Sequence, residues 1–221
     1  HDPFVSGAQL GNVKTVLLGA APVYASDLQL GLKVFGPRLW NGYGQGESPC
    51  TITAMSKSMI ADAAASGDED RLVSVGVART GVELRIDAPA VGDVGEVLVR
   101  GPTVMAGYWN LPEATAETLK DGWLHTGDIG KLDERGFLTL LDRAKDVIIS
   151  GGMNIYAREI EEVLLQDESV AEVAVIGLPD ADWGENVVAV IVAADGRTPD
   201  SAALDQLCLA QIARFKRPKR Y

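Results

Sequence analysis

Short apolar runs separated by polar turns dominate the chain up to about residue 150. Residues 13–19 form an apolar run that ends in a glycine, which is typical of a buried strand. Residues 82–87 and 94–100 alternate apolar and polar positions on either side of a Gly-Asp turn, which predicts a strand pair. Residues 61–71 are small, polar and acidic, which predicts a surface loop. The same patterns predict helices at 26–32 and 112–119 and strands at 51–55, 137–141 and 147–150.

The pattern changes towards the C-terminus. Residues 157–166 carry their apolar side chains on one face of a predicted helix. Residues 170–176 and 186–193 are rich in β-branched side chains and predict two buried strands, and residues 199–215 repeat apolar positions at helical spacing. This succession of strands and helices is sufficient for a small layered structure with its own core.

The change in pattern predicts a domain boundary near Lys145. We expect an α/β (α+β) protein with a β-rich domain at residues 1–144 and a small α+β domain at residues 145–221. An apolar content of 47% is ample for packed cores and argues against disorder. The chain has 31 acidic and 20 basic residues and a formal net charge of −11, which argues against nucleic acid as its main partner.

The cysteines and histidines give no sign of a metal site or a disulfide framework. Cys50 and Cys208 are far apart in the sequence, and the chain has only 2 histidines. No apolar run approaches the roughly 18 residues of a transmembrane helix, and no signal peptide is visible. We therefore expect a reduced, cytoplasmic protein.

Candidate chemistry is concentrated between residues 122 and 164. Gly127 lets the backbone turn sharply before Asp128, whose carboxylate can accept the two hydrogen bonds that a vicinal diol such as ribose offers. Arg143 adds a planar cation suited to phosphate or hydroxyl oxygens. Upstream, Tyr43 lies between two glycines, where its ring can stack on a flat ligand. The alternatives are a core tyrosine, a buried aspartate that caps a helix and an arginine in a surface ion pair.

These residues belong to several motifs that occur in a fixed order. They are LLGAAP (17–22), NGYGQGESP (41–49), GEVLVRGPTVMAGYWN (95–110), HTGD (125–128), the Arg143 segment and SGGMNIYAREIE (150–161). Together they resemble the adenylate-forming superfamily of acyl-CoA synthetases, firefly luciferases and adenylation domains, over most of the chain. The resemblance implies that the first domain is the β-rich end of the large adenylate-forming domain and that the second is the small lid domain.

The resemblance also implies a nucleotide site. In that family the tyrosine packs against adenine, the aspartate accepts both ribose hydroxyls, and the arginine faces ribose or phosphate. Glu47 matches the carboxylate that binds Mg²⁺ beside the phosphates of ATP, with a surface acid as the alternative. The residues implied in nucleotide binding are Ala20, Ala21, Pro22, Asn41, Gly42, Tyr43, Gly44, Gln45, Gly46, Asp128 and Arg143. The implied catalytic residues are Glu47, Arg143 and Lys145.

This sequence departs from the family pattern at two of these positions. Gly46 stands where threonine is usual, so that a hydroxyl for phosphate is absent or is supplied by Ser48 or water. Ala20 stands where glycine is usual, which is expected to narrow the slot for the acyl group slightly. The simple alternative for the segment around Ala20 is an exit from a strand into a turn.

The second domain carries the residues implied in thiol transfer. Lys145 matches the hinge about which the family's small domain rotates, with an ordinary solvated lysine as the alternative. Ser150, Gly151 and Gly152 match the segment that leaves room for the pantetheine of CoA, and a β-turn between strand and helix is an alternative compatible with that role.

The resemblance further implies an activity. A carboxylic acid, fatty or related, would react with ATP to give acyl-AMP and pyrophosphate, and CoA would then release AMP. The segment IISGGMNIY favours a CoA ligase over an adenylation domain that loads a carrier protein, although that alternative and a non-catalytic nucleotide-binding or interaction module stay open. The family's phosphate loop is expected before the first residue and its late lysine after the last. We therefore expect a fragment that is inactive alone.

Overall fold

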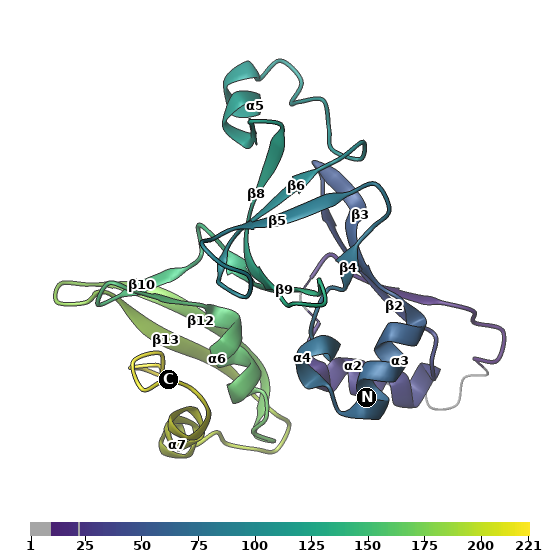
Figure 1. Cartoon of the computed structure of the whole chain (residues 1–221). Helices are drawn as coiled ribbons and strands as arrows, with labels where there is room; N and C mark the ends of the chain where they lie inside the picture. Colours follow the sequence, from purple (N-terminus) through teal and green to yellow (C-terminus); the bar gives the residue numbers. More distant parts are fainter. Residues whose placement is uncertain (1–9, 22) are drawn as a thin grey trace. The chain divides into compact units, whose positions relative to one another are not determined.

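The computed structural model describes residues 10–21 and 23–221, and it divides the chain into two compact units. Unit 1 comprises His1–Leu140 and unit 2 comprises Leu141–Tyr221, so the division falls just before the boundary expected at residues 144 and 145. Figure 1 shows the elements of both units, and each unit is described by itself.

Unit 1 begins with a four-stranded sheet in the order β1-β2-β3-β4. Its strands are β1 (Val16–Leu18), β2 (Leu39–Gln45), β3 (Ser48–Met55) and β4 (Val77–Ala78), and its helices are α2 (Ala25–Phe35), α3 (Lys57–Ser66) and α4 (Glu69–Leu72). Strand β1 runs parallel to β2, while the β2–β3 and β3–β4 pairs are antiparallel. The parallel register places Leu18 opposite Asn41 and so brings the end of β1 beside the middle of β2.

A second sheet of unit 1 has the order β5-β6-β8-β7, and β9 pairs with β8. The elements are β5 (Glu83–Asp87), β6 (Gly95–Arg100), α5 (Pro112–Thr118), β7 (Leu119–Lys120), β8 (Trp123–Leu132) and β9 (Leu138–Arg143), in which the unit boundary falls. Residues 83–87 and 95–100 pair in an antiparallel register, which confirms the predicted strand pair. Strand β8 was not predicted, and it carries the HTGD motif.

Two apolar clusters form the core of unit 1. In one, Leu28 of α2 and Ile60 of α3 pack with Leu39 of β2, which holds the helices against the first sheet. The other joins Ile52 of β3 to side chains of the second sheet, among them Val97 of β6. All five side chains are at most 1% exposed, and each burial contributes about 1.5–3 kcal/mol.

The predicted loop at residues 61–71 is wrong, because most of this segment is helical. Helix α3 covers Lys57–Ser66 and α4 covers Glu69–Leu72. Ser56 caps α3 by accepting a hydrogen bond from the Met59 N–H, and Gly67 ends it in the left-handed conformation with φ 67°. The alanines that read as loop composition are the strongest helix formers, and Ala63 is fully buried against the core.

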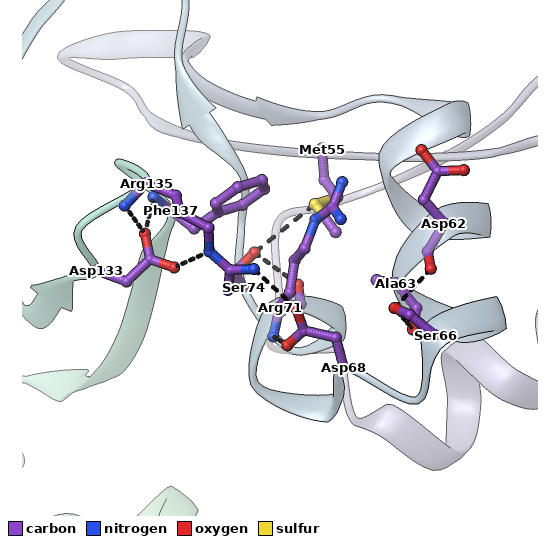
Figure 2. Close-up of polar contacts among 10 residues, drawn as sticks. All are labelled: Met55, Asp62, Ala63, Ser66, Asp68, Arg71, Ser74, Asp133, Arg135 and Phe137. Carbon is purple, nitrogen blue, oxygen red and sulfur yellow. Dashed lines mark hydrogen bonds and ion pairs between the residues drawn. The ribbon is translucent and has the colours of Figure 1, made fainter.

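A polar cluster joins α4 to the turn between β8 and β9 (Figure 2). The Arg135 guanidinium donates to Asp68 Oδ2 and to Asp133 Oδ2, each at 2.9 Å. The guanidinium groups of Arg71 and Arg135 lie 5.0 and 5.4 Å from the centroid of the Phe137 ring. The hydrogen bond from Arg135, followed by that from the Arg71 backbone, lowers the pKa of Asp68. The cluster thus joins helix α4 to the second sheet of unit 1 through charged contacts.

Replacing Asp68 with asparagine should lower the melting temperature at neutral pH, and this effect should shrink in acid. Because the pKa of Asp68 is lower in the folded than in the unfolded state, its stabilisation is complete above about pH 4 and is lost as the pH falls through the folded-state pKa. Melting curves of wild type, Asp68→Asn and the control Asp70→Asn between pH 7 and pH 3 test this. A wild-type advantage over Asp68→Asn that stays constant across this range would contradict it.

Unit 2 is a four-stranded sheet in the order β11-β10-β13-β12, with helix α6 packed on β12 and helix α7 packed on α6. Its elements are β10 (Ile148–Ser150), β11 (Met153–Ile155), α6 (Ala157–Leu164), β12 (Val170–Asp180), β13 (Gly184–Ala193) and α7 (Ser201–Gln211). The core includes Ile155, Ile160, Leu164 and Leu204, each at most 1% exposed. The predicted strands and helices of this unit are present in the predicted order, but β11 was not predicted and α7 ends at Gln211 rather than at residue 215.

Two further properties bear on the sequence predictions. Cys208 is fully buried and free, and its burial raises the pKa of its thiol. None of the helices described in residues 10–21 and 23–221 is both long enough and apolar enough to span a membrane.

Candidate functional site

Strand β2 positions Tyr43 in the second core cluster of unit 1, where the residue is 8% exposed. The preceding Gly42 cannot carry a side chain, because a Cβ there would lie 2.4 Å from the ring of Trp40. The Tyr43 hydroxyl donates a hydrogen bond to Asp128 Oδ2 at 2.5 Å. The two residues, which are 85 positions apart in the sequence, therefore meet in one site.

Asp128 lies within strand β8, not at the end of a connection as its glycine neighbour suggested, and it caps no helix. The alternation of the strand places Thr126 and Asp128 on the buried face, where Asp128 is 6% exposed. A carboxylate can accept about four hydrogen bonds, so Asp128 can bind a diol and keep the bond from Tyr43.

The Asp128 segment of β8 is irregular. Gly127 has φ 68°, a left-handed conformation that glycine adopts without steric cost. The Thr126 hydroxyl donates to the Val97 carbonyl at 2.7 Å and accepts from the Asp128 N–H at 3.1 Å. Glu96 accepts from the Gly127 N–H at 2.9 Å and lies 2.8 Å from His125 Nδ1. Sequence reasoning missed Thr126, Glu96 and His125, although all three belong to motifs that it quoted.

Glu47 lies in the two-residue turn between β2 and β3, next to the exposed Gly46. Its Oε1 accepts a hydrogen bond from the Tyr108 hydroxyl at 2.5 Å, and its carbonyl accepts from the Met105 N–H at 2.8 Å. The hydrogen bond to Glu47 and burial raise the pKa of Tyr108, which keeps this hydroxyl a donor at neutral pH. Tyr108 is a fourth residue that sequence reasoning missed, and it fixes the orientation of the Glu47 carboxylate.

The donor set around Glu47 decides which kind of metal site is compatible with the fold. Within the described part of the chain, no three His, Cys, Asp or Glu side chains are grouped so that they could hold a metal ion. Mg²⁺ commonly uses one or two carboxylates and completes its shell with phosphate oxygens and water. Glu47 therefore fits a Mg²⁺ that arrives with a phosphorylated ligand.

The loop after β1 approaches β2 next to Tyr43. A Cβ on Gly19 would lie 2.8 Å from the Gly42 carbonyl oxygen, so only a glycine lets the two backbones come this close. Ala20 has φ 66°, a conformation that costs a residue with a Cβ about 1 kcal/mol, which explains why glycine suits this position better. Ala21 is exposed, and the predicted residue Pro22 lies outside the described residues. Among the remaining predicted residues, Asn41 is buried on β2 and Gln45 donates to the Thr126 carbonyl at 3.4 Å.

The residues predicted for hinge and CoA binding lie in unit 2. The carbonyl of Arg143 accepts from the N–H groups of Asp146 and Val147 in the turn that contains Lys145, and the side chains of Arg143 and Lys145 are exposed. Gly151 and Gly152 have φ 59° and 78° and connect β10 to β11 with Ser150 opposite Met153. They form a hairpin turn between two strands, not a turn between strand and helix, and two consecutive positive φ angles explain the glycine pair.

Two protein-family models match parts of this chain. Residues 2–109 match the model of the AMP-binding enzyme, and residues 159–221 match that of the AMP-binding enzyme C-terminal domain. The chain belongs to the AMP-binding enzyme family. The motif resemblance to adenylate-forming acyl-CoA synthetases is thereby confirmed. The first match falls in unit 1 and the second falls in unit 2.

Individual relatives agree with the family assignment. The chain is 39% identical over 215 residues to the medium/long-chain-fatty-acid–CoA ligase FadD8 of Mycobacterium tuberculosis, covering 95% of this chain and 36% of the relative. The amide bond synthetase McbA from Marinactinospora thermotolerans superposes with a TM-score of 0.89 at 36% identity, covering 99% of this chain and 44% of that one.

A third relative has been solved with a reaction intermediate. The o-succinylbenzoate CoA synthetase of Bacillus subtilis, in complex with the acyl-adenylate OSB-AMP, gives a TM-score of 0.82 at 33% identity, covering 94% of this chain and 42% of that one. The chain thus spans about two fifths of the length of the proteins that it matches. These superpositions confirm the mixed α/β fold expected from the sequence.

Proposed function

We propose that the complete protein is an AMP-forming acid–CoA ligase, which activates a carboxylic acid, fatty or related, with ATP and transfers the acyl group to CoA. Membership of the AMP-binding enzyme family and the CoA ligases among its relatives support this activity. The observation that carries the proposal is the hydrogen bond between Tyr43 and Asp128. It joins an aromatic ring and a diol-binding carboxylate in the unit that matches the AMP-binding model.

In the first step, a carboxylate oxygen of the acid attacks the α-phosphorus of ATP and pyrophosphate leaves. Tyr43 packs against the adenine, with the glycine-rich backbone from Asn41 to Gly46 beside it, and Asp128 accepts the ribose hydroxyls. Arg143 binds ribose or phosphate oxygens. Glu47 holds Mg²⁺, which supplies positive charge where negative charge develops on the phosphates. The protein's contribution to this step is orientation, because the reacting groups come from the ligands.

In the second step, the thiolate of CoA attacks the acyl carbonyl and AMP leaves with the pair of electrons of the broken C–O bond. We assign the backbone at Ser150, Gly151 and Gly152 to the passage of pantetheine. A rotation of unit 2 about Lys145 brings this backbone to the acyl-adenylate. A Cβ on Gly151 would lie 2.8 Å from the Trp183 ring, so a larger residue at this position would require the Trp183 side chain to shift.

The test follows both products separately. The complete protein is incubated with ATP, Mg²⁺ and a panel of fatty, aromatic and dicarboxylic acids, and pyrophosphate is measured with and without CoA. We expect acid-dependent pyrophosphate release together with CoA-dependent formation of AMP and thioester. Absence of acid-dependent pyrophosphate release for every acid in the panel would contradict the proposal.

A second acceptor is favoured by one observation. The amide bond synthetase McbA superposes over 99% of this chain. Adding an amine or a phosphopantetheinyl carrier protein in place of CoA therefore distinguishes the alternatives. Release of AMP with an amine or with the carrier protein alone would leave adenylate formation intact and replace CoA as the acceptor.

A further inference from the structure

Strands β6 and β8 are unequal in length around Asp128. Leu98 pairs with His125 and Glu96 pairs with Ile129. Between these pairs β6 has only Val97, whereas β8 has residues 126–128. Extra residues in one strand of a pair form a β-bulge, in which some backbone groups lose their hydrogen bonds to the neighbouring strand. Each such group that is buried requires another hydrogen-bond partner.

Side chains supply the missing partners. The Thr126 hydroxyl donates a hydrogen bond to the Val97 carbonyl and accepts one from the Asp128 N–H. The Glu96 carboxylate accepts a hydrogen bond from the Gly127 N–H at 2.9 Å. The bulge is thus fixed on both sides of the Gly127 peptide. Asp128 follows this peptide directly. The rotation of the Gly127 peptide therefore sets the direction in which the Asp128 carboxylate points.

Glu96 is itself held in place. Its second oxygen lies 2.8 Å from His125 Nδ1, and the two side chains are 27% and 25% exposed. A carboxylate with one oxygen on a backbone N–H and the other on a ring nitrogen has little rotational freedom. Glu96 is therefore a fixed hydrogen-bond acceptor for the bulge rather than a solvated surface acid.

We propose that Glu96 is a positioning residue for nucleotide binding, which holds the Gly127 peptide so that the Asp128 carboxylate faces the ribose. His125 orients Glu96 and thereby acts one step further from the ligand. The inference rests on the proposed function, because it takes Asp128 as the acceptor of the ribose hydroxyls.

The experiment measures ribose recognition directly. Affinities for AMP and for 2′,3′-dideoxy-AMP are determined by calorimetry with the complete protein. If Glu96 positions Asp128, its loss lowers the affinity only for AMP, the ligand with ribose hydroxyls. A general loss of structure lowers both affinities, so the ratio of the two affinities separates these effects. Glu96→Ala should weaken AMP binding about tenfold and leave the affinity for dideoxy-AMP nearly unchanged, since a misaligned charged hydrogen bond loses roughly this much.

Three variants make the result specific. Glu96→Gln keeps an oxygen for the Gly127 N–H and should retain most of the preference for AMP. Glu96→Met keeps the side-chain length without an acceptor, and it replaces Glu96→Ala if that variant does not fold. Glu83→Ala removes a carboxylate paired with Arg100 on the same sheet and should leave the preference unchanged.

The outcomes separate the inference from the function on which it rests. A wild-type protein without preference for AMP, or a preference that survives Asp128→Ala, overturns the ribose role of Asp128. A preference that is lost in Asp128→Ala but fully kept in both Glu96→Ala and Glu96→Met overturns the positioning role alone.

Discussion

Replacing Asp128 with alanine is expected to weaken AMP binding about 100-fold, because two charged hydrogen bonds to the ribose are lost at roughly 1.5 kcal/mol each. The variant should also be less stable by about 1–3 kcal/mol, because the buried Tyr43 hydroxyl loses its acceptor. Calorimetric titration with AMP, at a temperature well below the melting point of each variant, measures the first effect and thermal denaturation the second.

The matched control is Asp128→Asn, which keeps one oxygen for Tyr43 and replaces the other with a donor. Its stability should lie near that of the wild type, whereas its AMP affinity should fall almost as far as in Asp128→Ala. An AMP affinity unchanged in both variants would remove Asp128 from the site.

Replacing Glu47 with alanine is expected to slow adenylate formation by a factor on the order of 100 to 1,000, the usual effect of removing one group that stabilises transition-state charge. The defect should appear in acid-dependent exchange of pyrophosphate into ATP, and excess Mg²⁺ should reduce it in part, since phosphates keep most of the metal ligands. Exchange rates measured across a range of Mg²⁺ concentrations test both points.

Tyr108→Phe is the control for Glu47, because it removes only the hydroxyl that orients the carboxylate. Its exchange rate should fall by less than about tenfold, in line with the loss of one hydrogen bond. Exchange that proceeds at the wild-type rate in Glu47→Ala would exclude Glu47 from metal and phosphate binding.

Tyr43 and Asp128 were both named from the sequence as candidate site residues, and the structure joins them by a hydrogen bond. Their roles towards a nucleotide stay predictions, whereas the local structure around Asp128 was not predicted. Strand β8 escaped prediction because Thr126 and Asp128, two polar residues, occupy its buried positions. The alternation of apolar and polar residues therefore did not indicate a strand, since polar residues are buried here, against the usual relation between polarity and exposure.

The residues that support the site could not be found from local patterns. Tyr108 meets Glu47 across 61 positions, and Glu96 meets Gly127 across 31 positions. Both contacts depend on how loops and strands assemble, which periodicity does not encode. Motif membership was the only available signal, because Glu96 and Tyr108 both belong to the segment at residues 95–110. By contrast, the two long strands of the small domain were predicted, because their β-branched side chains form simple apolar patterns, while the short strand β11 was not.

A crystal structure of the complete protein with bound AMP tests the central claim most directly. We expect both ribose hydroxyls within hydrogen-bond distance of the Asp128 carboxylate and the adenine against the Tyr43 ring. AMP bound at a different place, with neither residue in contact with it, would contradict the assignment.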